Sequence, residues 1–401
     1  MPQRETPRPQ ALHDIRVLDV TQVMAGPFCA MLLCDMGADV IKLEPPNGDA
    51  TRHWGGGVGA DTPAFNAVNR GKRSIAVNLK TEDGRAIAIQ LARTADVLVE
   101  NYRPGVMTSL GLDYQTLREE NPGLVYASIS GYGQTGPAAA KGGFDLVAQG
   151  VSGIMSVTGE PARTPMKAGV PVTDLGAGLF ATVGILGALH HRVATGEGQL
   201  IDTSLVEAGV AMSVWEAAEF FSTGQAPRQF GSAHRTSAPY QAIKCADGYI
   251  TLGAANDRLF ARLCRLLGRP EWVEDPRFAT NETRVAHHEV LAKDIEALTC
   301  HHPRAWWIGR LEAEGIPCGP INSYAEVFDD PQIIARDMVQ ETEHPTIGRF
   351  KTLGSPLKLS GTPLIPGRPA PQLGADTDDI LADAGFTPDE ITRFRTTGAV
   401  K

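Results

Sequence analysis

The order of segments along the chain predicts an α/β fold built on a Rossmann-like sheet. Short apolar, β-rich runs alternate with helical patterns through the first half, each run is apolar on both faces, and turn residues bound it. Parallel strands are buried on both faces and therefore read as continuous apolar runs. The predicted strands are residues 15–20, 39–43, 74–79, 96–100 and 124–130, and residues 199–206 form a further strand-like run.

Helices are predicted between these strands. Residues 27–36 fit one, because Pro27 suits a first turn and Gly37 a helix end. Residues 82–94 and 207–221 fit two more, and a long helix follows Asp174. This long helix is rich in glycine, at a cost of about 1 kcal/mol for each relative to alanine. The cost is tolerable where small residues let another backbone or a ligand approach closely.

The second half changes character. A polar connector precedes a hairpin-like run at 240–254, where Asp247-Gly248 is a turn signal, and helical patterns continue to about Glu314. The predicted organisation is a first part of the large domain (11–221), a connector (222–239), a small domain (240–320), and a return to the large domain with the C-terminal tail (321–401).

Composition excludes several classes of protein. The net charge of −9 and the lack of Lys/Arg-rich runs argue against nucleic-acid binding. The apolar run 175–189 is shorter than the roughly 20 residues of a membrane span, so no membrane association is expected. The six cysteines form no CxxC pair, and the paired histidines are adjacent in sequence and make poor metal sites, so we expect a reducing, cytoplasmic location and no metal.

Asp174 precedes the long helix and has two interpretations. As an N-cap, its oxygen accepts a backbone N–H of the first turn. The same place keeps a carboxylate ionised by the helix dipole, and an ionised carboxylate within reach of an acyl group is a competent nucleophile. Asp145, after two glycines, is either a turn or cap residue or a second carboxylate that orients a substrate. Spacing alone leaves both pairs open.

Loops that follow parallel strands are where such sheets bind ligands. Here they are residues 22–27, 101–105 and 131–137. Positive side chains near them suggest a phosphate-bearing ligand, although each fits a solvated surface equally well; they are Arg70, Lys72, Arg73, Lys80 and Arg103. No Walker A motif is present, so an ATP-binding P-loop is not supported.

Several long motifs resemble class III CoA-transferases. QVMAGPFCAMLLCDMGADVIKLEPPNGDATR resembles the opening of that family, and NRGKRSIAVNLK, ADVLVENYRPG and SISGYGQTGP follow in the family's order. PVTDLGAGLFATVGILGALHHRVATGEGQLIDTSL resembles its active-site segment, and EGIPCGPINS resembles the return to the large domain. The resemblance spans about residues 12 to 398.

The resemblance implies an interlocked homodimer, each subunit having a Rossmann-like large domain built from both chain ends and an inserted smaller α+β domain. It implies that Asp174 is the nucleophile, that Asp145 is a supporting carboxylate, and that coenzyme A is a substrate moiety with no cofactor bound permanently. The positions that it assigns to CoA contact are Val23, Ala25, Val77, Lys80, Asn101, Tyr102, Arg103, Gly131, Tyr132 and Gly133.

Departures from the family's subgroups narrow the substrate. Met24 stands where formyl-CoA enzymes carry glutamine, and GAANDR (253–258) replaces their tetraglycine loop, which argues against formyl and oxalyl substrates. Phe144 stands where α-methylacyl-CoA racemases carry a histidine, so half of their acid/base pair is missing. The pattern resembles succinate/glutarate-type enzymes most.

A dicarboxylate substrate would need a cation near Asp174. Arg52, Arg73, His234 and Arg235 are the candidates, and Met24 is a further candidate to contact the substrate. The favoured function is CoA transfer between an acyl-CoA and a short dicarboxylic acid. A racemase-type isomerase and a non-catalytic acyl-CoA-binding protein remain open.

Overall fold

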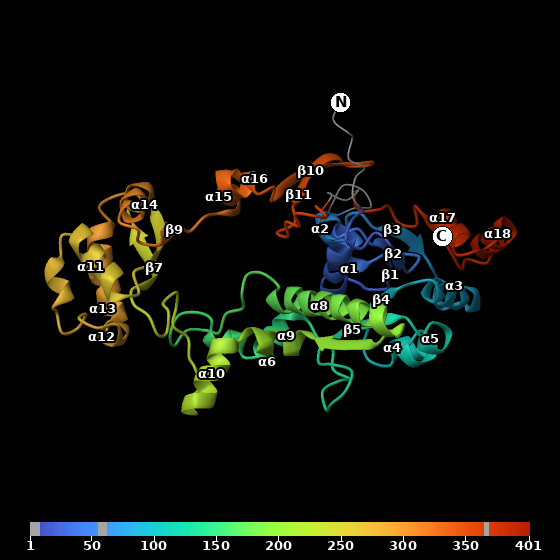
Figure 1. The fold of residues 1–401 in the computed structure, drawn as a ribbon, viewed down its shortest axis with the longest axis horizontal. Helices are drawn as coiled ribbons and strands as arrows, with labels where there is room; N and C mark the ends of the chain where they lie inside the picture. Colours follow the sequence, from blue (N-terminus) through green and yellow to red (C-terminus); the bar gives the residue numbers. More distant parts are fainter. Residues whose placement is uncertain (1–8, 55–61, 365–368) are drawn as a thin grey trace. The chain divides into compact units, whose positions relative to one another are not determined.

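The computed structural model describes residues 9–54, 62–364 and 369–401. Its main sheet has six parallel strands in the order β3-β2-β1-β4-β5-β6 (Figure 1). The strands are β1 (Arg16–Asp19), β2 (Asp39–Glu44), β3 (Arg73–Ala76), β4 (Val97–Glu100), β5 (Val125–Ser130) and β6 (Leu200–Ser204). The predicted α/β class with a Rossmann-like parallel sheet is confirmed, and the strand bounds match the apolar runs within three residues.

Helices cover both faces of this sheet. Leu33 of α1 (Ala25–Asp35) and Ile185 of α8 (Val172–Thr195) belong to the apolar cluster on one face. Ile87 of α3 (Glu82–Arg93), Ile380 of α17 (Thr377–Asp383) and Phe394 of α18 (Pro388–Thr396) belong to the cluster on the other. Residues near the C-terminus thus complete a core that the first hundred residues begin.

Two helix predictions need correction. Helix α8 begins at Val172, with Pro171 at the N-cap, so Asp174 lies inside the first turn and is not the cap. The segment predicted as one helix over 207–221 is two, α9 (Leu205–Met212) and α10 (Val214–Thr223), interrupted at Ser213. The Ser213 hydroxyl donates to the Gly209 carbonyl at 3.0 Å, a local bond that competes with regular helix.

The apolar run at 175–189, predicted to be too short for a membrane span, belongs to a longer helix than expected. Helix α8 has 24 residues and, among the described residues, is the one helix long and apolar enough to pass as a span. Half of its most apolar window is buried inside the fold, where α8 packs on α1, α9 and β5. This is the pattern of a core helix.

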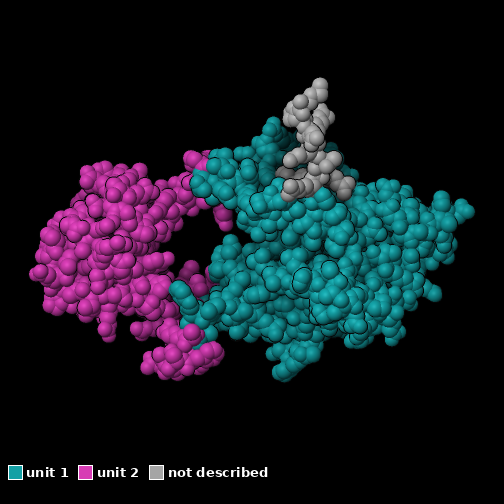
Figure 2. Space-filling view, in the orientation of Figure 1, with its two compact units in different colours: residues 1–154, 168–217, 332–401 teal, residues 155–167, 218–331 magenta. Residues whose placement is uncertain are grey.

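The chain divides into two compact units, coloured in Figure 2: residues 1–154, 168–217 and 332–401, and residues 155–167 and 218–331. The second unit contains the segment predicted as the small domain. It has a three-stranded antiparallel sheet, β7 (Tyr240–Cys245), β8 (Gly248–Gly253) and β9 (Cys318–Pro320). Cys245 pairs with Gly248, so the hairpin turn is Ala246–Asp247 and not Asp247-Gly248.

The remaining elements are mostly short. Those of the first unit, or at its limits, are the 3-10 turn η1 (Ala50–His53), α2 (Pro63–Asn69), α4 (Val106–Leu110), α5 (Tyr114–Glu120), α6 (Asp145–Val151), α7 (Ile154–Val157), α16 (Pro331–Ala335), β10 (Val339–His344) and β11 (Gly348–Leu353). The second unit also has α11 (Asp257–Leu266), η2 (Pro270–Val273), α12 (Asn281–Ala286), α13 (His288–Thr299), α14 (Arg304–Ala313) and α15 (Tyr324–Asp329).

Candidate active site

The order of the strands places a switch point between β1 and β4, where the chain leaves neighbouring strands in opposite directions. Parallel sheets bind ligands at such points, beyond the carboxyl ends of the strands. In this chain, hydrogen bonds join the loop after β1 directly to the loop after β4. The Gln22 N–H donates to Asn101 Oδ1 at 2.8 Å, Asn101 Nδ2 donates to the Gln22 carbonyl at 2.7 Å, and Gln22 Nε2 donates to the Tyr102 hydroxyl at 3.0 Å.

Val23, at this switch point, has a strained backbone. Its φ of 69° is in the left-handed region, which a β-branched side chain adopts only under constraint. Such a conformation costs about 1–3 kcal/mol and persists where the surroundings enforce it, often at ligand sites. The Val23 N–H donates to Asp49 Oδ2 at 3.2 Å. The next residues, Met24 and Ala25, begin helix α1.

Helix α8 crosses this same loop at Gly178. A Cβ at Gly178 would lie 2.7 Å from the Ala25 carbonyl oxygen, so only glycine allows the two backbones to approach this closely. This fulfils the expectation that a glycine of the long helix admits another backbone. Asp174 lies four residues before Gly178, about 6 Å along the helix axis, and the contact therefore places it near the β1–α1 loop.

Asp145 supports the first turn of α8. Its Oδ1 accepts from the Thr173 N–H at 3.0 Å and from Thr173 Oγ1 at 2.7 Å, while its Oδ2 accepts from Gln149 Nε2 at 2.7 Å. The helix is thus capped from α6 and not by Asp174. The Asp174 carboxylate has no hydrogen bond or ion pair to any residue that the structure describes.

The electrostatics of Asp174 are the reverse of the prediction. Burial in this turn, with the negative charge of Asp145 nearby, raises the pKa of Asp174 from 3.8 to about 7. The helix dipole was expected to keep the carboxylate ionised, but removing a carboxylate from water disfavours its charged form, and a like charge adds to this. The group therefore changes its protonation state near neutral pH.

Two further contacts close the site into a ring. A Cβ on Gly131, after β5, would lie 2.6 Å from Gly143 Cα, so a glycine pair brings this loop against the segment that leads to Asp145. A Cβ on Gly142 would lie 2.7 Å from Arg103 Nη2. The Ser130 hydroxyl accepts the Gly133 N–H at 2.8 Å and fixes the loop that contains Tyr132. The loops after β1, β4 and β5 and the first turn of α8 therefore meet.

Four residues of the first unit that were predicted to contact CoA or the substrate lie outside this ring. Val77 is fully buried in the core and Lys80 is exposed, both after β3 and two strands from the switch point. Arg52 Nε lies 2.7 Å from Glu44 Oε2, and Arg73 Nη2 lies 2.6 Å from Asp39 Oδ2. The buried pairing of Arg52 and the ion pairs of Arg73 are structural, which leaves neither guanidinium placed to bind a substrate. His234 belongs to the second unit, where Thr236 N–H donates to its Nδ1 at 3.2 Å.

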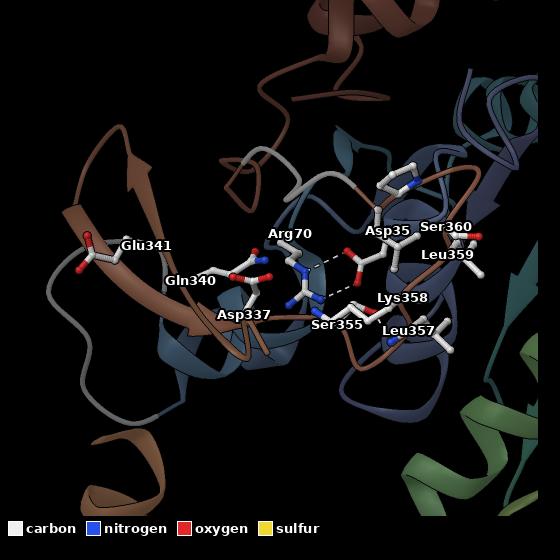
Figure 3. A pocket seen from close by; sticks show the side chains of 12 residues that line it. Asp35, Arg70, Asp337, Gln340, Glu341, Ser355, Leu357, Lys358, Leu359 and Ser360 are labelled. Atoms are coloured by element: carbon white, nitrogen blue, oxygen red, sulfur yellow. Dashed lines mark hydrogen bonds and ion pairs between the residues drawn. The ribbon is translucent and has the colours of Figure 1, made fainter. Parts of the chain in front are cut away.

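A small cavity adjoins the ring. It measures about 160 Å³ and lies at the ends of β4 and β5, with Glu100, Arg103, Ser128 and Gln134 among its lining residues. Burial raises the pKa of Glu100 to about 7. A larger cavity, about 680 Å³, lies at the β10–β11 hairpin and contains neither catalytic candidate. Figure 3 shows its Arg70 guanidinium turned toward Asp35, with Nε 3.0 Å from Oδ1.

Comparison with known proteins adds the family to this geometry. The sequence matches CoA-transferase family III over residues 12–377. The chain belongs to this family. It is 40% identical over 384 residues to the succinyl-CoA:glutarate CoA-transferase of Mus musculus, with 95% of this chain and 88% of that one covered. It is 41% identical over 347 residues to the acetyl-CoA:oxalate CoA-transferase of Acetobacter aceti, with 86% of this chain and 88% of that one covered.

A solved structure supports the same assignment. A CAIB/BAIF family protein from Brucella suis superposes with a TM-score of 0.86 at 39% identity, over 94% of this chain and all of that one. The expected resemblance is therefore confirmed, and the protein is a CoA-transferase, as the family match and the full-length relatives establish.

Four features of the site were not predicted from the sequence. Asp49 and Glu100 carry no motif that marks them as site residues. The strain at Val23 has no sequence signal, because valine does not indicate a left-handed backbone. The link between Gly131 and Gly143 had a weak signal, since a double glycine precedes Asp145. Close packing between glycines in different loops emerges only from the fold.

Proposed function

We propose that this enzyme transfers coenzyme A from an acyl-CoA to a free dicarboxylic acid through covalent intermediates on Asp174. The observation that carries the proposal is the position of Asp174: a carboxylate without an ion pair among the described residues, in the first turn of α8, beside the loops after β1, β4 and β5. No residue that the structure describes bonds to or pairs with this side chain, although removing an ionisable group from water, even in part, costs stability.

The first half of the reaction exchanges partners on Asp174. The ionised carboxylate attacks the thioester carbonyl of the donor, the C–S bond breaks, and CoA leaves as a thiolate while an aspartyl-acyl anhydride forms. The thiolate then attacks the aspartyl carbonyl of the anhydride, which releases the donor acid as a carboxylate and leaves an aspartyl-CoA thioester. No proton is consumed and no external oxidant or reductant is needed.

The second half repeats these two steps with the acceptor. The acceptor carboxylate attacks the aspartyl-CoA carbonyl and releases the thiolate, and the thiolate attacks the acceptor's acyl carbon in the new anhydride. The new acyl-CoA leaves and Asp174 is restored. Since a carboxylate is the nucleophile, every intermediate is reactive enough to be reversed, and the thioester's free energy is conserved provided that water is excluded.

The pKa of about 7 fits this role. A carboxylate that is harder to ionise is more basic and more nucleophilic once ionised, yet a useful fraction is ionised at neutral pH. Asp145 contributes in two ways: its charge raises the pKa of Asp174, and its bonds to Thr173 hold the turn that presents the nucleophile. The α8 N-terminus also favours negative charge as it develops in the transition state.

The dicarboxylate assignment rests on the relatives. Glutarate and oxalate, named for the mouse and Acetobacter proteins, are both dicarboxylic acids of different length. Met24 and the GAANDR segment argued against oxalate as a substrate. The oxalate named for the Acetobacter relative makes this acid a candidate acceptor again. Of the cations predicted to bind the substrate, Arg52 and Arg73 are already paired with carboxylates. Arg103, which lies against Gly142 at the site, is the better candidate in the first unit.

We also propose a cytoplasmic homodimer whose subunits interlock, as the family resemblance implies. Apolar side chains of α8 that are exposed in the single chain support an interface: Leu179, Phe180, Val183 and Leu186 fall on one face at helical spacing. The six cysteines are all free thiols, as in a reducing compartment. Light scattering tests the mass, and persistence of the dimer at nanomolar concentration tests interlocking.

One experiment separates the three functions that the sequence leaves open. The enzyme is incubated with succinyl-CoA and a panel of acids that includes glutarate and oxalate, and new thioesters are followed by mass spectrometry. CoA exchange that disappears in Asp174→Ala supports the proposal. Exchange that persists in this variant sinks it; solvent deuterium at the α-carbon of a branched acyl-CoA favours the racemase; binding without either reaction favours the non-catalytic protein.

A further inference from the structure

A buried network of charges lies behind the loop that runs from β1 into α1. Lys42, Lys72, Asp19 and Asp49 are all buried. The network touches the loop at both ends: Lys42 Nζ donates to the Thr21 carbonyl at 3.0 Å, and Lys72 Nζ donates to the Pro27 carbonyl at 3.0 Å. The segment between these two bonds carries Val23, Met24 and Ala25.

Asp49 is the member of the network that touches the middle of the loop. Its Oδ2 accepts from the Val23 N–H at 3.2 Å and lies 3.3 Å from Lys42 Nζ. Its Oδ1 accepts from the Thr51 N–H at 2.8 Å and from Thr51 Oγ1 at 2.7 Å. Donors thus surround both oxygens, and an amide nitrogen in place of either oxygen would face donors without an acceptor.

The bond to Asp49 falls on the residue whose backbone is strained. Val23 adopts φ 69° although valine is poorly suited to this region. A strained conformation persists only where the surroundings determine it. Asn101 holds the preceding residue through two bonds to Gln22, and α8 closes on the following turn at Ala25. Between these two constraints, Asp49 bonds to Val23 itself.

We propose that Asp49 is a positioning residue, which holds Val23 in the left-handed conformation and so sets the backbone of the loop that binds the acyl-CoA. The inference rests on the proposed function for its link to CoA. Asp49 does not touch the reacting atoms; it acts through Val23. The rest of the network keeps Asp49 charged and in place: Lys42 pairs with it, and Glu44, itself bonded to Arg52, accepts its N–H at 3.1 Å.

A double-mutant cycle between positions 49 and 23 tests the proposal. Asp49→Asn is expected to raise the KM for succinyl-CoA about tenfold and to change kcat less, because the loop binds the substrate and does not react. Glycine adopts a positive φ readily. In the Val23→Gly background Asp49→Asn should therefore raise KM by no more than about twofold. An equal rise in both backgrounds overturns the proposal.

A matched control separates positioning from general damage. Asp35 is also buried and also pairs with a cation, with its Oδ1 3.0 Å from Arg70 Nε, but it lies at the far end of α1 from the loop. Asp35→Asn should lower the melting temperature while leaving the KM for succinyl-CoA within about twofold of the wild type. If it raises KM as Asp49→Asn does, the effect is global and the proposal fails.

Thermal unfolding gives a readout that needs no activity. Asp49→Asn should lower the melting temperature more in the wild-type background than in the Val23→Gly background, and a cycle with no coupling contradicts the proposal. If Asp49→Asn does not fold alone, Asp49→Asn combined with Val23→Gly is expected to fold, and failure of both contradicts it equally. Absence of CoA transfer in the wild type would refute the proposed function, while this thermal cycle would still decide the role of Asp49.

Discussion

Two groups of charge in the first unit, one buried and one partly buried, differ in how they are paired. In the network behind the β1–α1 loop, Asp19 lies 2.8 Å from Lys72 and 3.9 Å from Lys42. Burial alone would raise the pKa of Asp19, but the two lysines outweigh burial and lower it to about 2. At the start of α8, Asp174 has burial and Asp145 acting in the same direction, and its pKa rises to about 7.

This difference in pairing distinguishes carboxylates that stabilise the fold from a carboxylate that can take part in a reaction. A buried carboxylate with cations and hydrogen-bond donors is fixed in one protonation state and one position, which suits the support of a loop. A partly buried carboxylate without a cation, beside a second carboxylate, changes protonation near neutral pH and is available to form a bond. We assign Asp19 and Asp49 to the first role and Asp174 to the second.

The largest expected effect is on catalysis. Asp174→Ala should lower CoA transfer by at least about 10⁴-fold, because no other group would form the anhydride. Asp174→Asn should be as inactive, since an amide is not a nucleophile toward a thioester. Turnover with succinyl-CoA and glutarate measures both, and near-wild-type circular dichroism shows that the fold is kept. Residual activity clearly above about 10⁻⁴ of the wild-type rate in either variant would contradict the assignment.

The next effect is on stability. Lys72→Met should destabilise the fold by about 3–5 kcal/mol, because it leaves Asp19 buried with one cation farther away and removes the bond to Pro27. The exposed pair of Arg93 and Glu120 provides the comparison: Arg93→Ala should cost no more than about 1 kcal/mol. Urea unfolding measures both variants, and equal costs would show that burial of the network is unimportant.

Substitution of two glycines of α8 by alanine should change the stability of the fold in opposite directions. Gly178→Ala should destabilise by about 1–3 kcal/mol, because its Cβ would lie 2.7 Å from the Ala25 carbonyl oxygen. Gly187→Ala has open space around its Cβ and should stabilise by up to about 1 kcal/mol. Thermal unfolding compares them. Destabilisation by both would mean that small residues are needed along the whole helix.

The remaining effects depend on pH. Because the folded pKa of Asp174 lies above its value of 3.8 in the unfolded chain, the folded state binds the extra proton, and the stabilisation that this gives is lost as pH rises toward 7. The stability gained by Asp174→Asn should therefore grow between about pH 4 and 7, by at most about 4 kcal/mol. Urea unfolding at several pH values measures it; a constant difference contradicts the raised pKa.

Transfer itself should rise with pH through about 7 as Asp174 ionises. In Asp145→Asn the rise in kcat/KM should move to lower pH, because the like charge is removed, while the rate at the plateau falls about tenfold through the weakened support of Thr173. A profile that stays in place would show that Asp145 acts only through hydrogen bonds.

The fold was largely predictable because its signals are local. Each strand of the main sheet is a short apolar run, and turn residues bound it, as at Gly37 and Gly123. The start of α8 was not predictable. Aspartate before an apolar helix is a common cap, but here the cap function comes from Asp145, which lies 28 residues earlier than Thr173 and contacts it only in the folded chain.

The site was predictable in part for the same reason. The loops after β1, β4 and β5 follow from strand order once the sheet is known. The roles of Arg52 and Arg73 could not be predicted, because an arginine that forms an ion pair within the fold looks the same in sequence as one that binds a substrate. The raised pKa of Asp174 depends on its burial and on the charge of Asp145, and neither can be inferred from the residues next to Asp174 in sequence.

The covalent step can be observed directly. The enzyme is incubated with succinyl-CoA, treated with hydroxylamine, which converts an aspartyl thioester or anhydride to a hydroxamate, and digested for peptide mass spectrometry. We expect a hydroxamate on Asp174 that depends on succinyl-CoA and is absent from Asp174→Asn. Rapid CoA transfer without modification of Asp174, or modification at Asp145 instead, would contradict the assignment of Asp174 as the nucleophile.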